Sequence, residues 1–327
     1  MRLIRPQALF PMLIFLGIVA GILALTSGSA DISAGEVWRS LTGSAPDNVH
    51  RLIMDLRLPR ALTAFGVGGL LAVAGVLMQV LLRNPLAEPY ILGSSGGAAV
   101  AALLAMMFGL GATLVDLSAF AGAMFATLLV FSIAQGTGNW TPTRLLLTGV
   151  VLAAGFSAAT TLLLALSPDQ NLRGMLFWLV GDLSFSYSPA QSLWLLAAIT
   201  LAGLAAARHL NVLARGDLQA AILGLPVAGF RLTIFAVTAL ATAISVTTVG
   251  VIGFIGLVVP HLIRIIAGSD HRVVLPASAL AGGTLLVIAD TLARTLLAPR
   301  QLPVGALTAT IGVPLFLILM SRSRRTG

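Results

Sequence analysis

The sequence predicts an all-α integral membrane protein with about ten transmembrane helices, and two observations lead to that prediction. The first is composition: 58% of the 327 residues are hydrophobic and 9% are charged, with a mean hydropathy of +1.02. A soluble domain carries roughly 25% charged residues, so this chain is too apolar to cover a surface that faces water. The second is that uncharged runs long enough to span a hydrocarbon core, about 20 residues, recur along the chain.

Nine apolar runs mark the expected spans. They cover residues 6–30, 61–82, 89–115, 117–143, 145–168, 183–207, 232–263, 273–289 and 301–321. The run at 232–263 is too long for one span, and Gly250, Gly253 and Gly256 offer a place where a helix can stop and reverse. Dividing the run there gives about ten spans. The run that begins at 273 is short, and we extend it past Asp290 to Leu297.

The first run has a second interpretation. Arg2 and Arg5, an apolar stretch and Gly28-Ser29-Ala30 also resemble a cleavable signal peptide. The apolar stretch is longer than a typical signal core, so a retained first span is the favoured interpretation.

The placement of arginine predicts the orientation. The chain contains no lysine, so all 19 basic residues are arginines. Cytoplasmic loops carry an excess of basic residues, and alternating the spans from a cytoplasmic N-terminus puts 12 arginines inside and 7 outside. The 11 acidic residues divide the other way, 3 inside and 8 outside. An even number of spans also returns the arginine-rich tail at 321–325 to the cytoplasm, so we expect both termini inside.

Short helices are expected outside the spans. Residues 31–55 form an outer loop in which an amphipathic helix follows a Ser33 cap, and residues 169–181 form a helix near the outer interface. The cytoplasmic loop 208–231 contains RGDLQAAILGLPVAGFR, in which apolar residues recur at helical spacing before a glycine and a proline end the helix.

Several classes of function are disfavoured by what the chain lacks. Without lysine it cannot build a P-loop, and without cysteine it has no thiolate metal site or cysteine nucleophile. An ion-coupled carrier usually buries an acid in mid-membrane, but Asp116, Asp182 and Asp290 fall near span ends. The four histidines are scattered, and the single arginines form no nucleic-acid-binding face. A permease driven by a separate motor is therefore favoured over an ion-coupled carrier or a membrane enzyme.

Two long stretches resemble a known family. They are RLPRALTAFGVGGLLAVAGVLMQVLLRNPLAEPYILGSSGGA, from Arg57, and GVIGFIGLVVPHLIRIIAGSDHRVVLPASALAGGTLLVIADTLAR, from Gly250, which is followed by QLPVGALTATIGVPLFLILM. These motifs resemble the FecCD-type permeases of binding-protein-dependent ABC importers for iron–siderophores, haem and cobalamin. The resemblance implies a type II ABC importer permease fold, with residues 1–327 as a single transmembrane domain.

The resemblance also implies partners and cargo. We expect a second permease subunit, forming a homodimer, two cytoplasmic ATP-binding subunits and a periplasmic or lipid-anchored substrate-binding protein. The chain itself is expected to bind no cofactor, to hold no metal and to be no enzyme, since ATP and Mg²⁺ are used by the partner ATPase. The expected location is the bacterial inner membrane, and the expected cargo is a bulky metal chelate. An iron(III)–siderophore is placed first, with haem and cobalamin as alternatives.

Three arginines on the outer side are candidates for docking the binding protein. Arg57 and Arg60 begin the second span and Arg294 ends the ninth, at positions where the family has docking residues. The planar guanidinium suits a partner's carboxylate; the alternative is that these side chains simply reach the lipid headgroups. Asp290, four residues before Arg294, is expected to pair with it along one helix face.

The cytoplasmic loop resembles the family's coupling helices. An amphipathic helix can lay its apolar face into a groove on a partner, although it can also rest on the membrane surface. The candidates for contact with the ATPase are Leu218, Ala221, Leu223, Gly224 and Leu225.

The string RNPLAEPYILGSSGG, from Arg83, lies between the second and third spans and is expected to form a cytoplasmic turn. The small residues after it have two interpretations, close helix packing or a pathway wall that leaves room for a bulky ligand. Gln79 is expected to donate an interhelical hydrogen bond rather than bind a ligand. The candidates for lining the pathway are Gln79, Gly93, Ser94, Ser95, Gly96 and Gly97.

Overall fold

The computed structural model describes residues 4–28, 30, 32–136, 141–184, 189–298 and 300–323, with side chains to residue 318. The described residues form helices and no strands. The N-terminal half contains α1 (Pro6–Thr26), α2 (Ala34–Leu41), α3 (Asp47–Arg51), η1 (Leu52–Arg57), α4 (Leu58–Leu81), η2 (Pro89–Leu92), α5 (Ser94–Met107), α6 (Ala112–Gln135) and α7 (Pro142–Leu166). The remainder contains α8 (Asp169–Val180), α9 (Pro189–Ala205), α10 (Ala207–Leu213), α11 (Asp217–Ile222), α12 (Val227–Val249), α13 (Ile255–Ala267), α14 (His271–Thr295) and α15 (Val304–Ser323).

Helix length and composition agree with a membrane protein. Within the described ranges, six helices are long and apolar enough to cross a bilayer, or seven if α9 and α10, bent by 67° at their junction, form one span. Three further apolar helices, α5, α13 and α15, are shorter. The expected break in the 232–263 run is confirmed, because α12 ends at Val249 and α13 begins at Ile255. The count of ten spans and the orientation stay predictions.

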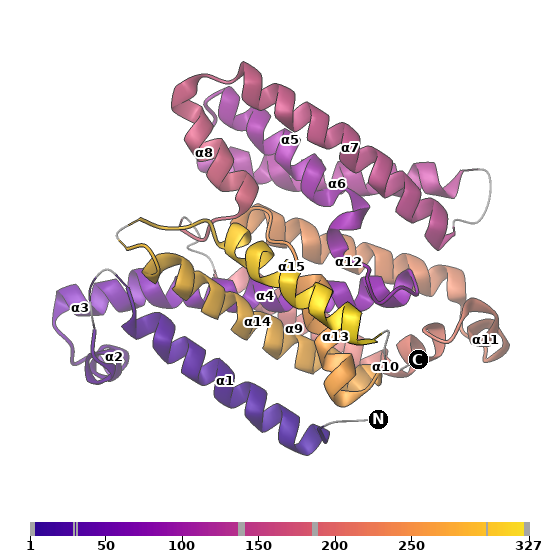
Figure 1. Cartoon of the computed structure of the whole chain (residues 1–327), viewed down its shortest axis with the longest axis horizontal. Coiled ribbons are helices and arrows are strands. Elements are labelled where there is room, and N and C mark those ends of the chain that lie inside the picture. Colours follow the sequence, from indigo (N-terminus) through magenta and orange to yellow (C-terminus); the bar gives the residue numbers. More distant parts are fainter. Residues whose placement is uncertain are drawn as a thin grey trace.

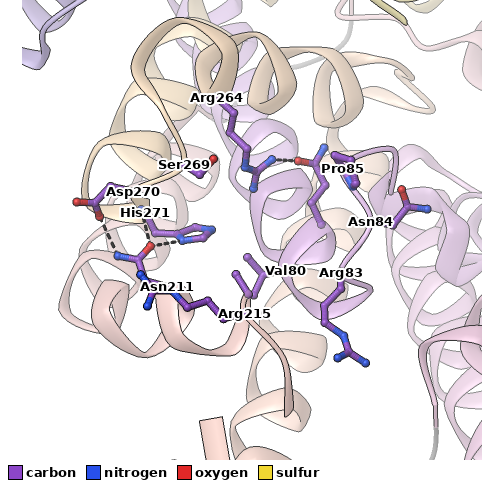
Figure 2. Close-up of a pocket in the computed structure, with 12 residues that line it drawn as sticks. Val80, Arg83, Asn84, Pro85, Asn211, Arg215, Arg264, Ser269, Asp270 and His271 are labelled. Carbon is purple, nitrogen blue, oxygen red and sulfur yellow. Dashed lines mark hydrogen bonds between the residues drawn. The ribbon is translucent and has the colours of Figure 1, made fainter. Parts of the chain in front are cut away.

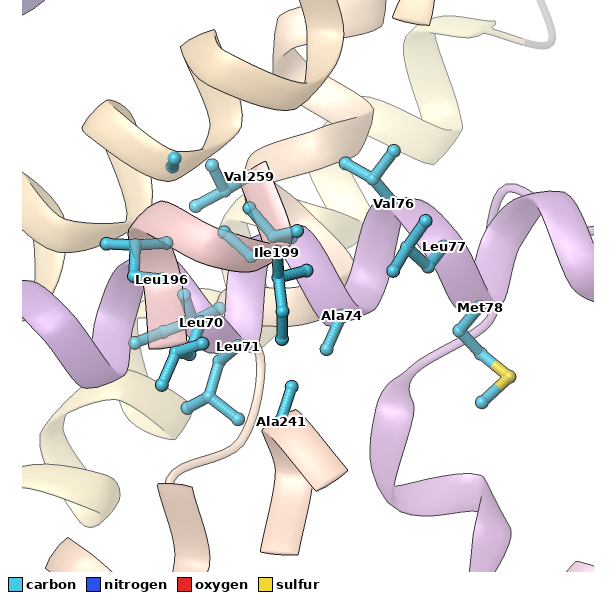
Figure 3. Close-up of a cluster of buried hydrophobic side chains, with 14 of the residues drawn as sticks. Leu70, Leu71, Ala74, Val76, Leu77, Met78, Leu196, Ile199, Ala241 and Val259 are labelled. Carbon is cyan, nitrogen blue, oxygen red and sulfur yellow. The ribbon is translucent and has the colours of Figure 1, made fainter. Parts of the chain in front are cut away.

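Helix α4 lies at the centre of the bundle. In the most apolar stretch of the helical run that contains α4, 89% of the residues are buried, whereas only 6% are buried in the corresponding stretch of α7. Figure 3 shows Leu70 and Leu71 of α4 beside Leu196 and Ile199 of α9, with Ala241 of α12 nearby. Helix α14 crosses α4 where two glycines meet, because a Cβ at Gly68 would stand 2.3 Å from the carbonyl oxygen of Gly282. Small residues permit this close approach. In lipid no hydrophobic effect drives helices together, so such van der Waals packing stabilises their association.

The two ends of the bundle carry different short helices. Figure 1 shows α2 and α3 at one end and α10 and α11 at the other, and the start of α1 and the end of α15 lie at the α10 end. The N-terminal end of α1 and the C-terminal end of α15 therefore lie on the same side of the bundle, as an even number of spans requires. Arg2, Arg324 and Arg325, which contributed to the predicted orientation, lie outside the described residues.

The outer loop differs in part from the expectation. The short helix is confirmed as α2, where Ser33 and Glu36 form a reciprocal cap and the hydrogen bonds from Ser33 lower the pKa of Glu36. Helical structure extends further into this segment than expected, because α3 and η1 continue into α4 as one helical run from Asp47 to Leu81. The location of residues 31–55 outside the membrane stays a prediction. The predicted helix at 169–181 is confirmed as α8.

Candidate functional site

A buried ion-pair network joins α4 and α14 at the α2 end of the bundle. The Arg60 guanidinium binds Asp290 with two donors, Nη2 at 2.8 Å from Oδ1 and Nε at 3.0 Å from Oδ2. Arg294 Nε donates to the same carboxylate at 3.2 Å, which confirms the predicted pair four residues apart. Asp290 is only 2% exposed. One carboxylate therefore fixes two of the three predicted docking arginines, and no sequence pattern indicated its link to Arg60.

Arg57 lies apart from that network and is 5% exposed. Its guanidinium donates to three main-chain carbonyl oxygens, those of Leu25 at 2.7 Å, Thr26 at 3.0 Å and Ala30. Cations favour the C-terminal end of a helix, where carbonyl oxygens lack intrahelical partners. Arg57 therefore caps α1, and this burial argues against the predicted docking role for it. Docking by Arg60 and Arg294 stays a prediction.

A cavity of about 540 Å³ opens near the same end. Helix α8 contributes Arg173, Phe177 and Trp178, and α6 contributes Asp116. The Arg173 guanidinium lies 5.8 Å from the centre of the Phe177 ring. Gln301 also lines the cavity and accepts a hydrogen bond from Arg60 at 3.5 Å. The cavity therefore adjoins the ion-pair network and offers aromatic faces beside charged groups. The sequence predicted the helix α8 but marked none of these residues as a candidate for binding.

The string that begins at Arg83 does more than turn the chain. Its first half forms the expected turn, with Leu86 N–H donating to Asn84 Oδ1 at 2.9 Å. Its second half supports the unwound segment between α12 and α13. Glu88 Oε1 accepts from Phe254 N–H at 2.9 Å, and the Tyr90 hydroxyl accepts from Ile252 N–H at 3.3 Å. Broken helices in lipid need such partners for their free main-chain groups, so the expectation of a simple cytoplasmic turn is corrected.

The small residues after this string pack against neighbouring helices. A Cβ at Gly96 would meet Phe156 of α7 at 2.7 Å, and one at Gly97 would meet Ala126 and the Gly122 carbonyl of α6 at 2.4 Å. Gly93 has a positive φ of 74° and begins α5. Ser94 is buried and Ser95 is half-buried. Within one subunit this geometry favours the packing interpretation over a pathway wall.

Gln79 is buried and polar. Its Nε2 donates to the Leu257 carbonyl at 3.4 Å, and its Oε1 accepts from Arg264. The predicted interhelical donor is therefore confirmed. Gln79 also lines a second cavity, at the α10 end of the bundle.

Helix α11 presents an apolar surface at the α10 end. Leu218, Ile222 and Leu223 are 76%, 75% and 69% exposed, and Ala221 is exposed as well. Gly224, at φ 80°, ends the helix. Leu225 differs from the other predicted contact residues because it is half-buried and packs against the core.

Two ion pairs tie α11 to the spans. Asp217 Oδ2 lies 3.1 Å from Arg231 Nη1 of α12 and 3.5 Å from Arg83 Nη2, beyond the end of α4. Asp217 is 36% exposed, so each pair contributes about 1 kcal/mol or less. The pairs do, however, give α11 a fixed position relative to two spans, which a helix that transmits force requires.

The described residues contain no group of three His, Asp or Glu side chains placed to hold a metal ion.

Comparison with known proteins identifies the family. Residues 15–322 match the FecCD transport family. The chain belongs to that family. The predicted resemblance is therefore confirmed over almost the whole length.

Members of the family with curated descriptions match end to end. The hemin transport system permease protein HmuU of Yersinia pestis is 40% identical over 339 residues, covering 99% of each chain. The vitamin B12 import system permease protein BtuC of Shigella boydii is 38% identical, covering 93% of this chain and 94% of its own. This FecCD family member is accordingly a multi-pass protein of the inner membrane.

Solved structures support the same fold. An inward-facing conformation of a metal-chelate type ABC transporter matches with a TM-score of 0.85 and 31% identity, covering 97% of this chain and 99% of its own. PsaBC of Streptococcus pneumoniae in complex with Fab matches with a TM-score of 0.59 and 18% identity, which shows likeness of fold alone. The all-helical FecCD fold thus has the architecture of an ABC transporter permease.

Proposed function

We propose that this chain is the permease subunit of an ATP-driven importer that moves a bulky metal chelate across the inner membrane. The observation that carries the proposal is helix α11, whose apolar side chains are exposed while Asp217 ties it to α4 and α12. Such a helix can lay its apolar face into a groove on a partner. The absence of lysine requires that the partner supply the P-loop.

The proposed assembly contains two copies of this chain, two ATP-binding subunits and a substrate-binding protein outside. ATP and Mg²⁺ belong to the ATP-binding subunits. Arg60 and Arg294 remain the proposed contacts for the binding protein, since each keeps some exposure, 14% and 10% for their side chains. Arg57 is left out because α1 covers it.

For the cargo, we favour a metal macrocycle, haem or cobalamin, over the iron(III)–siderophore that we placed first. Relatives that cover nearly the whole chain are named for hemin and vitamin B12. The cavity beside α8 has Phe177 and Trp178 in its wall, which suits a large, partly apolar ring. Arg173 in the same wall suits the acidic side groups of such a ligand.

An ion-coupled carrier is less well supported. Among the described residues that form ion pairs, Asp290 is the most buried acid, and its carboxylate is engaged by Arg60 and Arg294. A carboxylate whose two oxygens already accept from guanidiniums is a structural ion-pair partner rather than a free acid in mid-membrane. A membrane enzyme would need a catalytic cluster, and the described residues contain no group of three His, Asp or Glu side chains that could hold a metal ion.

The test is the interface on α11. Replacing both Leu218 and Leu223 by Glu should weaken ATPase binding at least tenfold, because burying one leucine contributes about 1.5–3 kcal/mol. Co-purification with the ATPase and titration of the purified subunits measure this. Gln219→Glu is the matched control, since it adds a charge to the same exposed helix without removing an apolar contact. Full retention of the ATPase by the double variant would refute the coupling role of α11.

A further inference from the structure

A second cavity, of about 580 Å³, lies at the α10 end of the bundle. Figure 2 shows its wall, which includes Arg83 beyond α4, Asn211 and Arg215 at α10, Arg264 of α13 and His271 of α14. These residues come from four helices that meet where the spans reach the cytoplasmic side of the predicted topology. Of these residues the proposed function uses only Arg83, through its pair with Asp217, and the inference below does not depend on that proposal.

The wall carries an excess of positive charge. It contains three arginines and one carboxylate, Asp270. Arg83 pairs with Asp217, which leaves Arg215 and Arg264 as the cations of the wall itself. Arg264 donates to the amide oxygen of Gln79, and no carboxylate in the described ranges lies within ion-pair distance of it. A half-buried guanidinium with a neutral partner retains several donors for an anion.

Polar side chains shape the same wall. Asn211 Nδ2 donates to Asp270 Oδ1 at 2.9 Å, and Asn211 Oδ1 accepts from the main-chain N–H of His271 at 3.0 Å. The His271 Nδ1 atom lies 2.6 Å from the same oxygen, which leaves Nε2 as the free ring nitrogen. His271 is 2% exposed, and its Nε2 has no hydrogen-bond partner among the described residues. Because Nδ1 donates to this amide oxygen, the neutral ring presents Nε2 as an acceptor, which suits a hydroxyl group of a ligand rather than its phosphate.

The chemistry of the wall selects an oxyanion. Guanidinium groups bind phosphate and carboxylate with paired donors. A single carboxylate side chain would leave most of a cavity of this size empty, whereas a phosphate with its glycerol or other headgroup is much larger. Basic pockets between the cytoplasmic ends of transmembrane helices suit anionic lipid headgroups. Ile265, the residue after Arg264, is 40% exposed and offers an apolar side chain at the same end of the bundle.

We propose that this cavity binds the phosphate headgroup of an anionic phospholipid from the inner leaflet, with Arg215 and Arg264 as the phosphate ligands. A headgroup there would connect the ends of α4, α10, α13 and α14. The lipid would thus be a structural part of the end that faces the ATPase.

The experiment is a lipid titration of the purified full chain in detergent, followed by native mass spectrometry. Phosphatidylglycerol and phosphatidylcholine with the same acyl chains are the two probes. We expect the wild type to prefer phosphatidylglycerol. The combination of Arg215→Gln with Arg264→Gln should weaken phosphatidylglycerol binding about 25-fold, at roughly fivefold for each arginine, and leave phosphatidylcholine binding unchanged.

The control combines Arg208→Gln with Arg272→Gln, two exposed arginines of the same end that do not line the cavity. It removes the same charge and should keep the preference. An equal loss in the control, or no preference in the wild type, would overturn the proposal. If the double glutamine variant does not fold, Arg264→Gln alone should lose about fivefold, and Arg215→Lys with Arg264→Lys should retain the preference; the reverse results count against the site.

Two further measurements distinguish a lipid headgroup from other sources of the anion. Millimolar inorganic phosphate should not displace phosphatidylglycerol, and displacement would assign the cavity to a free oxyanion instead. If the variants bind lipid as the wild type does but lose affinity for the ATPase, the cavity receives an acidic side chain of that subunit, and the lipid assignment is wrong.

Discussion

Gly75→Ala is expected to abolish most of the folded protein. A Cβ at this position would stand 1.9 Å from the carbonyl oxygen of Gly256 and 2.7 Å from its Cα, so the main chains of α4 and α13 would have to separate. The site lies in the most buried helix, beside the unwound segment that Glu88 and Tyr90 hold in place. Overpacking commonly costs about 1–3 kcal/mol, and we expect the upper end or more, because both colliding partners are main chain. Thermal unfolding and the yield of monodisperse protein in detergent measure it.

Gly21→Ala is the matched control for that change. Gly21 is also in a long apolar helix, α1, but a Cβ there would meet nothing within 4 Å. Alanine favours a helix over glycine by about 1 kcal/mol, so this variant should be neutral or slightly more stable. Equal stability of the two variants would contradict the close crossing of α4 and α13.

Asp290→Ala should be the second severe change. It removes the only carboxylate that the described structure places against Arg60 and Arg294, and it leaves two largely buried guanidiniums without their counter-ion. Breaking a buried ion pair by removing one partner costs about 3–5 kcal/mol. The same change releases the link from Arg294 to the Ala24 carbonyl, at 3.2 Å, so the adjoining ends of α1, α4 and α14 should loosen together. The thermal midpoint and hydrogen exchange in these three helices are the measurements.

Asp217→Ala provides the comparison, because Asp217 also pairs with two arginines but is 36% exposed against 2% for Asp290. Exposed pairs contribute about 1 kcal/mol or less, so its midpoint should fall far less. If both variants lose the same small stability, the network around Asp290 is not a structural anchor.

The positions of the long apolar helices could be predicted because lipid imposes a simple requirement, a run of about 20 apolar residues. The break near Gly250 and the pair of Asp290 with Arg294 were also within reach, since both depend on residues close in sequence. Burial was not predictable in the same way. Helices α4 and α7 are similarly apolar, yet one is enclosed by protein and the other is not, because lipid and protein core select the same side chains.

The parts of the candidate site that could not be predicted depend on contacts between residues far apart in the sequence. Arg60 binds Asp290, 230 positions away, and Glu88 accepts a hydrogen bond from Phe254, 166 positions away. No periodicity or motif spacing records such pairs. The carbonyl partners of Arg57 at the end of α1 were unpredictable for the same reason, because main-chain groups carry no side-chain signal. Leu225 fitted the helical spacing, but the fold turned it toward the core.

The two ends of the molecule have separate tasks in this proposal. The Arg60–Asp290–Arg294 network fixes the outer ends of the spans, where the binding protein is proposed to dock. Helix α11, at the opposite end, is the proposed contact for the ATPase. In this proposal the chain is a gate whose energy comes from that partner.

The most direct test is uptake of labelled haem or cobalamin by vesicles that contain the purified chain, with and without its ATPase and binding protein. We expect accumulation only when the ATPase, the binding protein and ATP are all present, and none with an ion gradient alone. Steady accumulation by the chain alone under an ion gradient, without nucleotide, would contradict a permease driven through α11.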